Sequence, residues 1–197
     1  MQIITECLPV PAGKVASVVT FLEMTVAPPP ARVDAGPYRF ERVSRCDLDW
    51  YRRFFQRIGA DWLWYSRLLM TDAELRGTLD HPEVDFYLLR DQGEEMGFFE
   101  LDRRNQPDIE IRFFGLAPEL VGKGLGKAMM AKALEVAWSY RPRRLFLHTC
   151  TLDHPRAVEF YRKAGFVAYG REVEIHDDPR VLGVLPRTVA PYVPIVE

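Results

Sequence analysis

The stretch Leu116-Ala-Pro-Glu-Leu-Val-Gly-Lys-Gly-Leu-Gly-Lys127 decides the fold. Its three alternating glycines, Gly122, Gly124 and Gly126, follow a strand-like run at 109–115 and precede a run with helical periodicity. A glycine-rich turn between a strand and a helix N-terminus leaves backbone N–H groups free, and the helix dipole there favours negative charge. The stretch therefore predicts a site for a phosphate or pyrophosphate.

Two common phosphate-binding motifs do not fit this stretch. In the Rossmann fingerprint G-x-G-x-x-G the third glycine would fall on Lys127. In a Walker A loop, Val121 and Ala128 would stand where the first glycine and the Ser or Thr belong. Taken without the rest of the sequence, this stretch is explained equally well by an anion site and by a glycine-rich turn that only connects a strand to a helix.

Length and composition indicate one globular domain. The chain has 197 residues, 48% of them hydrophobic, which is enough for a sizeable core. A net charge of −2 gives no electrostatic basis for binding nucleic acid or an anionic membrane. Cys7, Cys46 and Cys150 form no CxxC pair, which predicts reduced thiols and a cytoplasmic protein. No basic leader with an apolar segment and cleavage site is visible, so no export signal is expected.

The pattern of strands, helices and prolines divides the chain into three segments. The first, 1–36, holds a β-rich run at 14–26 that Pro28-Pro29-Pro30 ends. We expect it to lie outside the core, as an edge strand or in contact with the second subunit of a homodimer. The second, 37–176, is the predicted core domain. The third, 177–197, is rich in proline, which predicts an irregular tail that wraps the core or a neighbouring subunit.

The core domain begins with a strand at 38–44 and two helices. Asp47 is the predicted cap of the first helix, and a capping box at 71–74 opens the second. Strands at 84–90 and 95–101, joined by a tight turn, and a third at 109–116 then form an antiparallel series. Most of the aromatic rings between 50 and 70 are expected to pack the helices onto this sheet.

The second half of the core domain predicts a crossover. A helix at 124–140 links the 109–116 strand to a strand at 143–150, and such a connection makes the two strands parallel. The continuous apolar run at 145–147 predicts burial on both faces of the second strand. Pro155 and Gly165 bound a further helix, and a last strand follows at 166–175.

Two motifs resemble those of the GNAT acetyltransferases. The glycine loop is similar to their acyl-CoA loop, Gln/Arg-x-x-Gly-x-Gly/Ala, with Val121 at the Gln/Arg position. Ala157-Val-Glu-Phe-Tyr-Arg-Lys-Ala-Gly-Phe166 is similar to the family signature Asn-x-x-Ala-x-x-Phe-Tyr-x-x-x-Gly-Phe, with His154 at the asparagine position. The order of predicted elements over 38–175 is also similar to that fold, which makes a generic α/β domain a poor alternative.

The resemblance implies an α/β (α+β) GNAT fold, with a mixed central sheet of about six to seven strands and flanking helices. Two parallel strands of such a sheet splay apart to admit acetyl-CoA. The residues that the resemblance places at acetyl-CoA are Leu116, Val121, Gly122, Lys123, Gly124, Leu125, Gly126, Lys127 and His154.

The resemblance also implies the reaction, which is acetyl transfer from acetyl-CoA to a primary amine. A glutamate at the strand position of Glu110 is the general base in the histone-acetyltransferase branch, so Glu110 is our candidate base, acting directly or through water. Tyr161 matches the family's general acid near the CoA sulfur. The alternative for Glu110 is an exposed or ion-paired carboxylate, with Arg112 as its partner. The alternative for Tyr161 is a half-buried ring on an amphipathic helix.

The sequence also contains residues of other chemical types. His148, Cys150, Asp153 and His154 are metal-ligand types, but their spacing matches no zinc pattern and we expect no metal. A non-catalytic acyl-CoA-binding domain and a protein or peptide acetyltransferase remain alternatives. The resemblance implies that the segment 47–81, between the first two strands, walls the acceptor side. Its rings and arginines favour a small amine, such as an amino acid or related metabolite that carries a carboxylate. The candidate arginines are Arg52, Arg53, Arg57 and Arg67.

Overall fold

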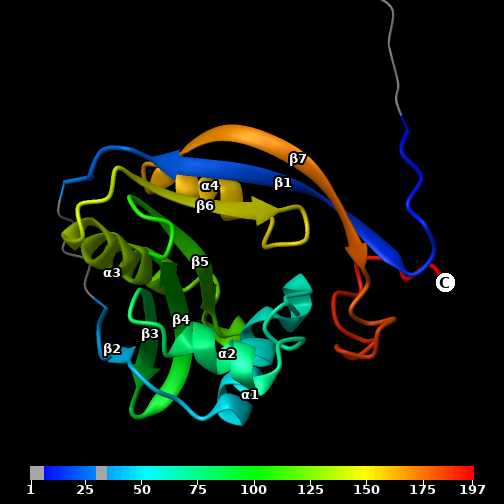
Figure 1. Cartoon of the computed structure of the whole chain (residues 1–197), viewed down its shortest axis with the longest axis horizontal. Coiled ribbons are helices and arrows are strands. Elements are labelled where there is room, and N and C mark those ends of the chain that lie inside the picture. The colour runs from blue at the N-terminus through cyan, green and yellow to red at the C-terminus, as the bar shows by residue number, and fades with distance from the viewer. Residues whose placement is uncertain (1–6, 30–34) are drawn as a thin grey trace, which may run out of the picture.

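The computed structural model describes residues 7–29 and 35–197, and this part of the chain forms one sheet of seven strands in the order β2-β3-β4-β5-β6-β1-β7 (Figure 1). The strands are β1 (Lys14–Met24), β2 (Arg39–Val43), β3 (Val84–Asp91), β4 (Glu94–Asp102), β5 (Asp108–Leu116), β6 (Arg144–Cys150) and β7 (Val167–Asp177). The helices are α1 (Leu48–Gly59), α2 (Asp72–Leu79), α3 (Leu125–Ser139) and α4 (Ala157–Lys163), with 3-10 turns η1 (Ala60–Trp62) and η2 (Pro118–Leu120). The predicted mixed sheet with flanking helices is confirmed.

Some expectations concern residues that the structure does not describe. The start of the chain at 1–6, where an export signal would begin, and 30–34 of the proline-rich run lie outside the described residues. Within the described ranges, no helix is long and apolar enough to cross a membrane.

The two helix caps that the sequence predicts are present. The Asp47 carboxylate accepts a hydrogen bond from the Trp50 backbone N–H at 2.8 Å, at the start of α1. At the start of α2, the Thr71 hydroxyl accepts from the Glu74 N–H at 3.3 Å, and the Glu74 carboxylate accepts from the Thr71 N–H at 2.8 Å. Each cap satisfies N–H groups that the first turn of a helix leaves without partners.

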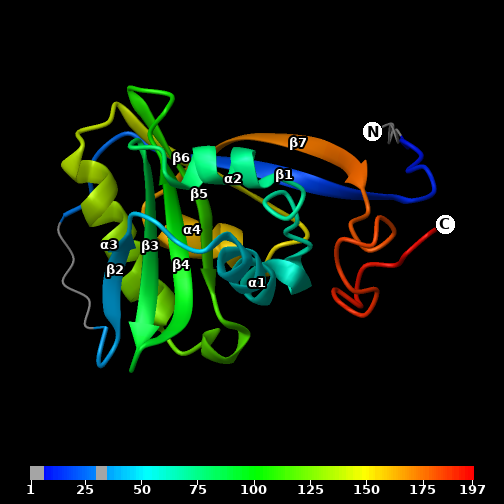
Figure 2. The ribbon, with the colours of Figure 1, turned by 60° about the horizontal axis from the view of Figure 1, so that its bottom comes forward.

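Alternating side chains of the sheet build a core on each face. On β4, Phe98 packs with the aromatic residues of α1 and Phe99 packs with α3, because successive side chains of a strand point to opposite faces. Figure 2 shows the middle strands standing between α3 on one side and α1 on the other. Rings of α1, such as Tyr51, Phe54 and Phe55, are buried, as the sequence predicts for most of that segment.

Strands β5 and β6 are parallel, as the crossover predicts, but they pair over a short length. Their register runs from Asp108↔Arg144 to Glu110↔Phe146 and then ends, while β5 continues to pair with β4 as far as Leu116. A bulge at Arg112 interrupts the β4–β5 register, and such a bulge bends its strand. The two parallel strands therefore diverge beyond Glu110, which confirms the expected splay.

Strand β1 lies inside the sheet, so the expected edge position is wrong. It pairs antiparallel with β6 on one side and with β7 on the other, and β7 is the edge strand. The β-forming residues at 14–26 indicate a strand, but strand propensity does not say which strands flank it. The segment limits at 36 and 176 stay a prediction, although 14–24 belongs to the same sheet as the core.

Strand β6 is covered on one face only, so its predicted burial on both faces is wrong. Leu145 and Leu147 are buried under α3, whereas Phe146 is half-buried and His148 is exposed. Helix α1 lies over the middle strands and leaves this part of the opposite face open. Helix α4 starts at Ala157, two residues later than Pro155 predicts, and Gly165 follows it with a left-handed φ of +104°.

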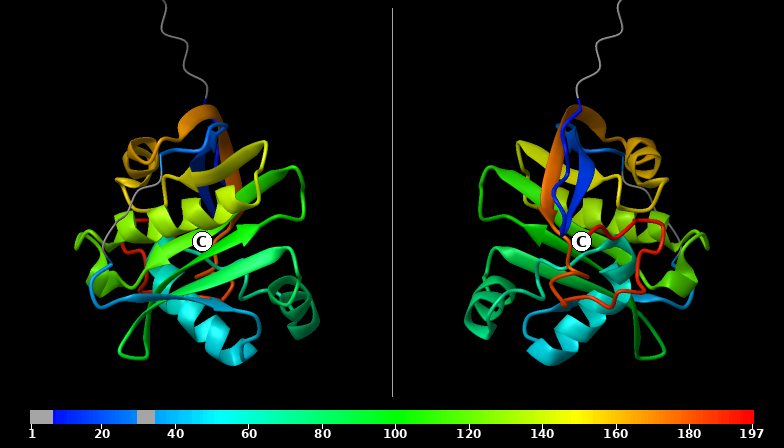
Figure 3. Two further views of the ribbon diagram at one scale, coloured as in Figure 1. Left: turned by 90° about the vertical axis from the view of Figure 1, so that its left-hand side faces the viewer. Right: turned by 90° about the vertical axis from the view of Figure 1, so that its right-hand side faces the viewer.

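The C-terminal tail is irregular and wraps the core, as its prolines predict. The buried Arg180 guanidinium binds the Asp178 carboxylate at 2.7 Å and donates to the backbone carbonyls of Val189, Ala190 and Val193. The right panel of Figure 3 looks at the end of the molecule where the tail lies. Apolar tail residues pack there against Val15, Leu63 and Leu152.

The Tyr192 hydroxyl joins the tail to the rest of the protein. It lies 2.8 Å from the Asp61 carbonyl oxygen and 2.9 Å from that of Leu152. Removing it in Tyr192→Phe should lower the free energy of unfolding by about 1 kcal/mol, the usual net value of a neutral hydrogen bond. Chemical denaturation measures this. Tyr169→Phe is the control, because that hydroxyl bonds to no described residue, and equal unfolding midpoints for the two variants would contradict the assignment.

Candidate active site

A cavity of about 690 Å³ opens where β5 and β6 diverge. The glycine loop and the end of β5 form one part of its wall, and the end of β6 with α4 forms another. The segment 62–66 and the C-terminal end of β7 close the far part. The cavity therefore extends from the predicted anion site to the aromatic segment that follows α1.

The glycine loop has the backbone geometry of an anion site. Gly122 and Gly124 have φ of +85° and +86°, values that L residues rarely adopt. Among the described residues, no acceptor binds the backbone N–H groups of Gly122, Gly124, Leu125 or Gly126. These N–H groups lie at the start of α3, where the helix dipole adds positive potential.

The predicted acetyl-CoA residues do not all face the cavity. The loop residues Lys123 and Leu125 do not contribute side chains to its wall. Those that line it are Leu116, Val121, Gly122, Gly124, Gly126, Lys127 and His154. Lys127, Arg156 and Lys163 add positive charge to the same wall. Arg156 and Lys163 occupy positions that the second motif leaves unspecified.

Tyr161 lines the cavity from α4. Its ring packs against Phe114, Phe160 and Phe166, at centroid distances of 5.4–6.3 Å. Burial raises the pKa of the Tyr161 hydroxyl well above its ordinary value, and the negative charge of Asp153 raises it further. The phenol therefore stays protonated at neutral pH and can serve as a proton donor.

Glu110 lies at the fork itself but not on the cavity wall. Its side chain is 12% exposed, with the Arg112 guanidinium at 3.0 Å and Nδ1 of His148 at 3.4 Å from the same carboxylate oxygen. Burial alone would raise the pKa of Glu110, but His148 and Arg112 outweigh it and lower the pKa. Arg112 and His148 do line the cavity. The structure thus places Glu110 in an ion pair, behind two side chains that reach the cavity.

Asp153 connects the loop after β6 to the aromatic segment. Its carboxylate accepts hydrogen bonds from the Trp64 indole N–H at 3.0 Å, the Thr149 hydroxyl at 2.7 Å and the Cys150 backbone N–H at 3.0 Å. In the part of the chain that the structure describes, no three His, Cys, Asp or Glu side chains are grouped to hold a metal ion. Asp153 therefore acts as a structural acceptor that fixes Trp64.

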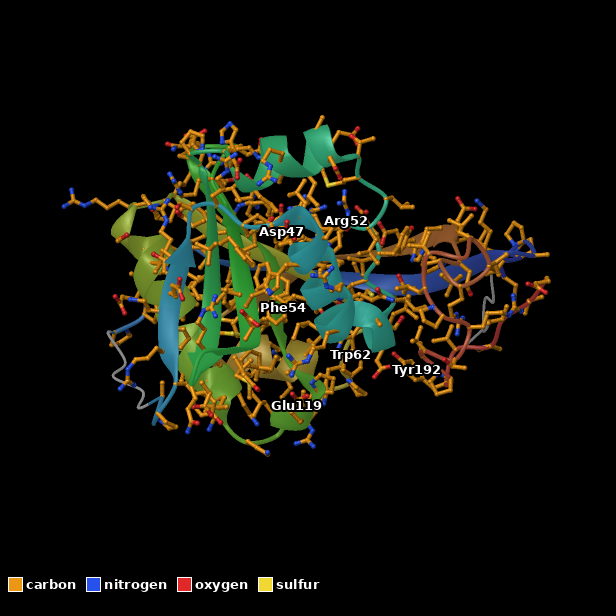
Figure 4. The ribbon with its side chains drawn as sticks, turned by 90° about the horizontal axis from the view of Figure 1, so that it is seen from below. Asp47, Arg52, Phe54, Trp62, Glu119 and Tyr192 are labelled. Carbon is orange, nitrogen blue, oxygen red and sulfur yellow. The ribbon has the colours of Figure 1, made fainter. Side chains whose placement is uncertain are left out.

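The aromatic segment reaches the cavity, but its arginines do not. Trp62, Trp64 and Tyr65 line the cavity, and Trp62 stands edge-on to the His154 ring at 5.6 Å. Figure 4 shows Trp62 beside Tyr192, where the tail meets η1. The arginines instead hold other parts of the fold: Arg52 binds Asp72, Arg57 binds Glu119, and Arg67 binds the buried Glu100. The expectation that an arginine of 47–81 faces the acceptor is wrong, and Arg53 does not line the cavity either.

Three cavity residues come from strands that the sequence did not connect to the site. Ser17 of β1 and Glu174 and His176 of β7 line its far part. The Tyr65 hydroxyl lies 3.2 Å from Nδ1 of His176, which ties this wall together. Finding these residues required the β1–β7 pairing, and nothing local to either strand indicates it.

Comparison with known proteins agrees with this geometry. Residues 48–166 match the acetyltransferase (GNAT) family. The chain is 26% identical over 137 residues to an uncharacterized N-acetyltransferase of Methanocaldococcus jannaschii, which covers 66% of this chain and 60% of that protein. A GCN5-related N-acetyltransferase from Sphaerobacter thermophilus superposes with a TM-score of 0.64 at 15% identity, over 88% of this chain and 54% of that one. A GNAT family acetyltransferase from Streptococcus pneumoniae gives a TM-score of 0.51 at 19% identity, over 66% and 87%.

A forked pair of parallel strands with a glycine loop at the fork defines an acyltransferase-type α/β fold. This chain belongs to the acetyltransferase (GNAT) family. The two solved structures are only 15% and 19% identical to this chain, so they support its fold and not a particular activity. The chain spans about 60% of the length of the curated relative that it matches.

Proposed function

We propose that this protein transfers an acetyl group from acetyl-CoA to a primary amine of a small molecule. The observation that carries the proposal is that the unpaired N–H groups of the glycine loop and the Tyr161 side chain belong to one cavity. The loop and Lys127 would hold the pyrophosphate of acetyl-CoA, and the diverging strands would admit its pantetheine arm. The three unpaired cysteines agree with a cytoplasmic setting.

The reaction needs a proton acceptor for the amine and a proton donor for the leaving thiolate. In this proposal the amine nitrogen forms a bond to the acetyl carbon and the carbon–sulfur bond breaks. Tyr161 gives its proton to the sulfur and regains one from the nitrogen. Before it attacks, the acceptor ammonium must lose one proton to become a neutral amine. The negative charge of the ionised Glu110 at the fork favours the removal of that proton.

The far part of the cavity suits a small acceptor. Trp62 and Tyr65 offer planar apolar surface, while Arg112 and Glu174 offer charges of both signs. An ammonium group would be attracted by Glu174 and a carboxylate by Arg112. These features favour an amino acid or a related metabolite over a polyanion or a protein tail.

A panel of amines tests the function. We expect release of free CoA from acetyl-CoA with small primary amines, particularly those that carry a carboxylate. Release only with basic peptides or proteins would favour a protein acetyltransferase. Binding of acetyl-CoA in calorimetry without turnover of any amine would favour the non-catalytic alternative and overturn this proposal.

Substitution of Trp62 tests whether an aromatic ring of the cavity contacts the acceptor amine. Trp62→Ala should raise the KM for the best amine of the panel by about 2- to 13-fold, because a lost aromatic contact is worth roughly 0.5–1.5 kcal/mol. The value of kcat should change much less. Steady-state kinetics with the wild type and the variant measure both constants. An unchanged KM would mean that the ring only packs against His154.

A further inference from the structure

His148 separates Glu110 from the space that an acceptor amine would occupy. Its side chain is 39% exposed and lines the cavity, whereas Glu110 is 12% exposed and does not. Arg112 covers the carboxylate from the other side at 3.0 Å. Direct proton transfer from an amine to Glu110 would require one of these two side chains to move away.

The two nitrogens of the His148 ring have different surroundings. Nδ1 lies 3.4 Å from the Glu110 carboxylate, and Nε2 makes no hydrogen bond to any residue that the structure describes. The backbone of His148 is held by the pairing of β6 with β1 at His148↔Phe21, and the centroid of the Phe21 ring lies 6.1 Å from that of the imidazole. A histidine with a carboxylate beside one nitrogen and no partner at the other can exchange a proton at that second nitrogen.

We propose that His148 is the general base of this protein, and that Glu110 is a positioning residue that acts through it. This inference rests on the proposed acetyl transfer and deepens it by reassigning the proton acceptor. The Glu110 carboxylate holds the proton on Nδ1, so Nε2 offers its lone pair to the cavity. It also stabilises the imidazolium that forms when Nε2 takes a proton.

The proton balance of the reaction is complete with these groups. An N–H bond of the ammonium breaks, its electron pair stays on nitrogen, and the proton forms a bond to Nε2 of His148. The neutral amine then attacks the acetyl carbon, and Tyr161 exchanges protons with sulfur and nitrogen as described above. His148 returns its proton to water, so each turnover yields one amide, one CoA thiol and one released proton.

Several charged groups surround the His148 ring and enter any pH dependence. Glu110 is the nearest, and Arg112 on the same strand opposes its effect. Glu23 on β1 and Arg144 on β6 lie on the neighbouring strands. The other titratable or charged groups of the cavity wall are Tyr65, Lys127, Cys150, Asp153, His154, Arg156, Glu159, Tyr161, Lys163, Glu174 and His176.

The test uses the full chain, the best amine of the panel and rates measured at saturating acetyl-CoA between about pH 5.5 and 9.5. His148→Gln should lower kcat about 10²-fold at neutral pH, within the range expected for loss of a general base. Its remaining rate should rise with pH across the whole range. Glu110→Gln should lower kcat less than His148→Gln does. The double variant should be no slower than His148→Gln, because Glu110 acts only through the imidazole.

The controls separate catalysis from folding. His81→Gln removes a histidine of the turn before β3, which does not line the cavity, and should keep the wild-type profile. All variants should bind acetyl-CoA with wild-type affinity in calorimetry, and added imidazole should partly restore His148→Ala. A Glu110→Gln variant slower than His148→Gln, or a multiplicative loss in the double variant, would overturn the inference and restore Glu110 as the base. If the wild type turns over no amine, the proposed function fails and this inference fails with it.

Discussion

Replacing Gly124 by glutamate is expected to abolish the binding of acetyl-CoA. Gly124 is the residue before α3, with a φ of +86°, and a side chain at such a φ costs about 1–2 kcal/mol of backbone strain. The added carboxylate would also place negative charge beside the unpaired N–H groups of Gly122, Leu125 and Gly126, where the pyrophosphate is expected. Isothermal titration calorimetry with acetyl-CoA measures the loss.

Gly183 provides a matched control for this substitution. It lies in the C-terminal tail with a φ of +72°, and a Cβ there would meet nothing within 4 Å, as at Gly124. Gly183→Glu therefore introduces the same kind of strain and the same charge away from the cavity wall. It should bind acetyl-CoA like the wild type. Wild-type affinity in Gly124→Glu would show that the loop is only a connection between β5 and α3.

The elements could be predicted where local signals set them. Asp47 and Thr71 start their helices through side-chain hydrogen bonds within three residues. The turn between β3 and β4 depends on two successive residues, Gln92 and Gly93, that both have positive φ. The glycine loop is local in the same sense, since its φ values and free N–H groups follow from the order of its residues. The parallel pairing of β5 and β6 follows from the helical crossover, α3, that joins them.

What could not be predicted depends on contacts between distant parts of the chain. The sequence shows that 14–26 forms a strand, but the position of β1 between β6 and β7 depends on competition among all the strand edges. That position brings Ser17, Glu174 and His176 to the cavity. The contact between His148 and Glu110 could not be predicted for the same reason. Its nearest charged partner, Glu110, is 38 positions earlier and is brought to it by a short parallel register.

Tyr161→Phe is expected to lower turnover by about 10²- to 10⁴-fold while leaving the affinity for acetyl-CoA unchanged. The Tyr161 hydroxyl makes no hydrogen bond to any residue that the structure describes, so no structural contact depends on it. The ring contacts with Phe114 and Phe166 are kept by phenylalanine, so the thermal midpoint should stay the same. What the variant loses is the proton that the departing thiolate needs.

The high pKa of Tyr161 sets the pH behaviour of this donor. Because burial and Asp153 raise that pKa above its ordinary value of about 10, the donor form persists throughout the neutral range. Loss of the wild-type rate through deprotonation of Tyr161 should therefore begin only above pH 10. Tyr169→Phe, on β7 and away from the cavity wall, is the control and should keep full turnover. Full turnover in Tyr161→Phe would remove it as the proton donor, and a fall in acetyl-CoA affinity as large as the fall in rate would make it a binding residue instead.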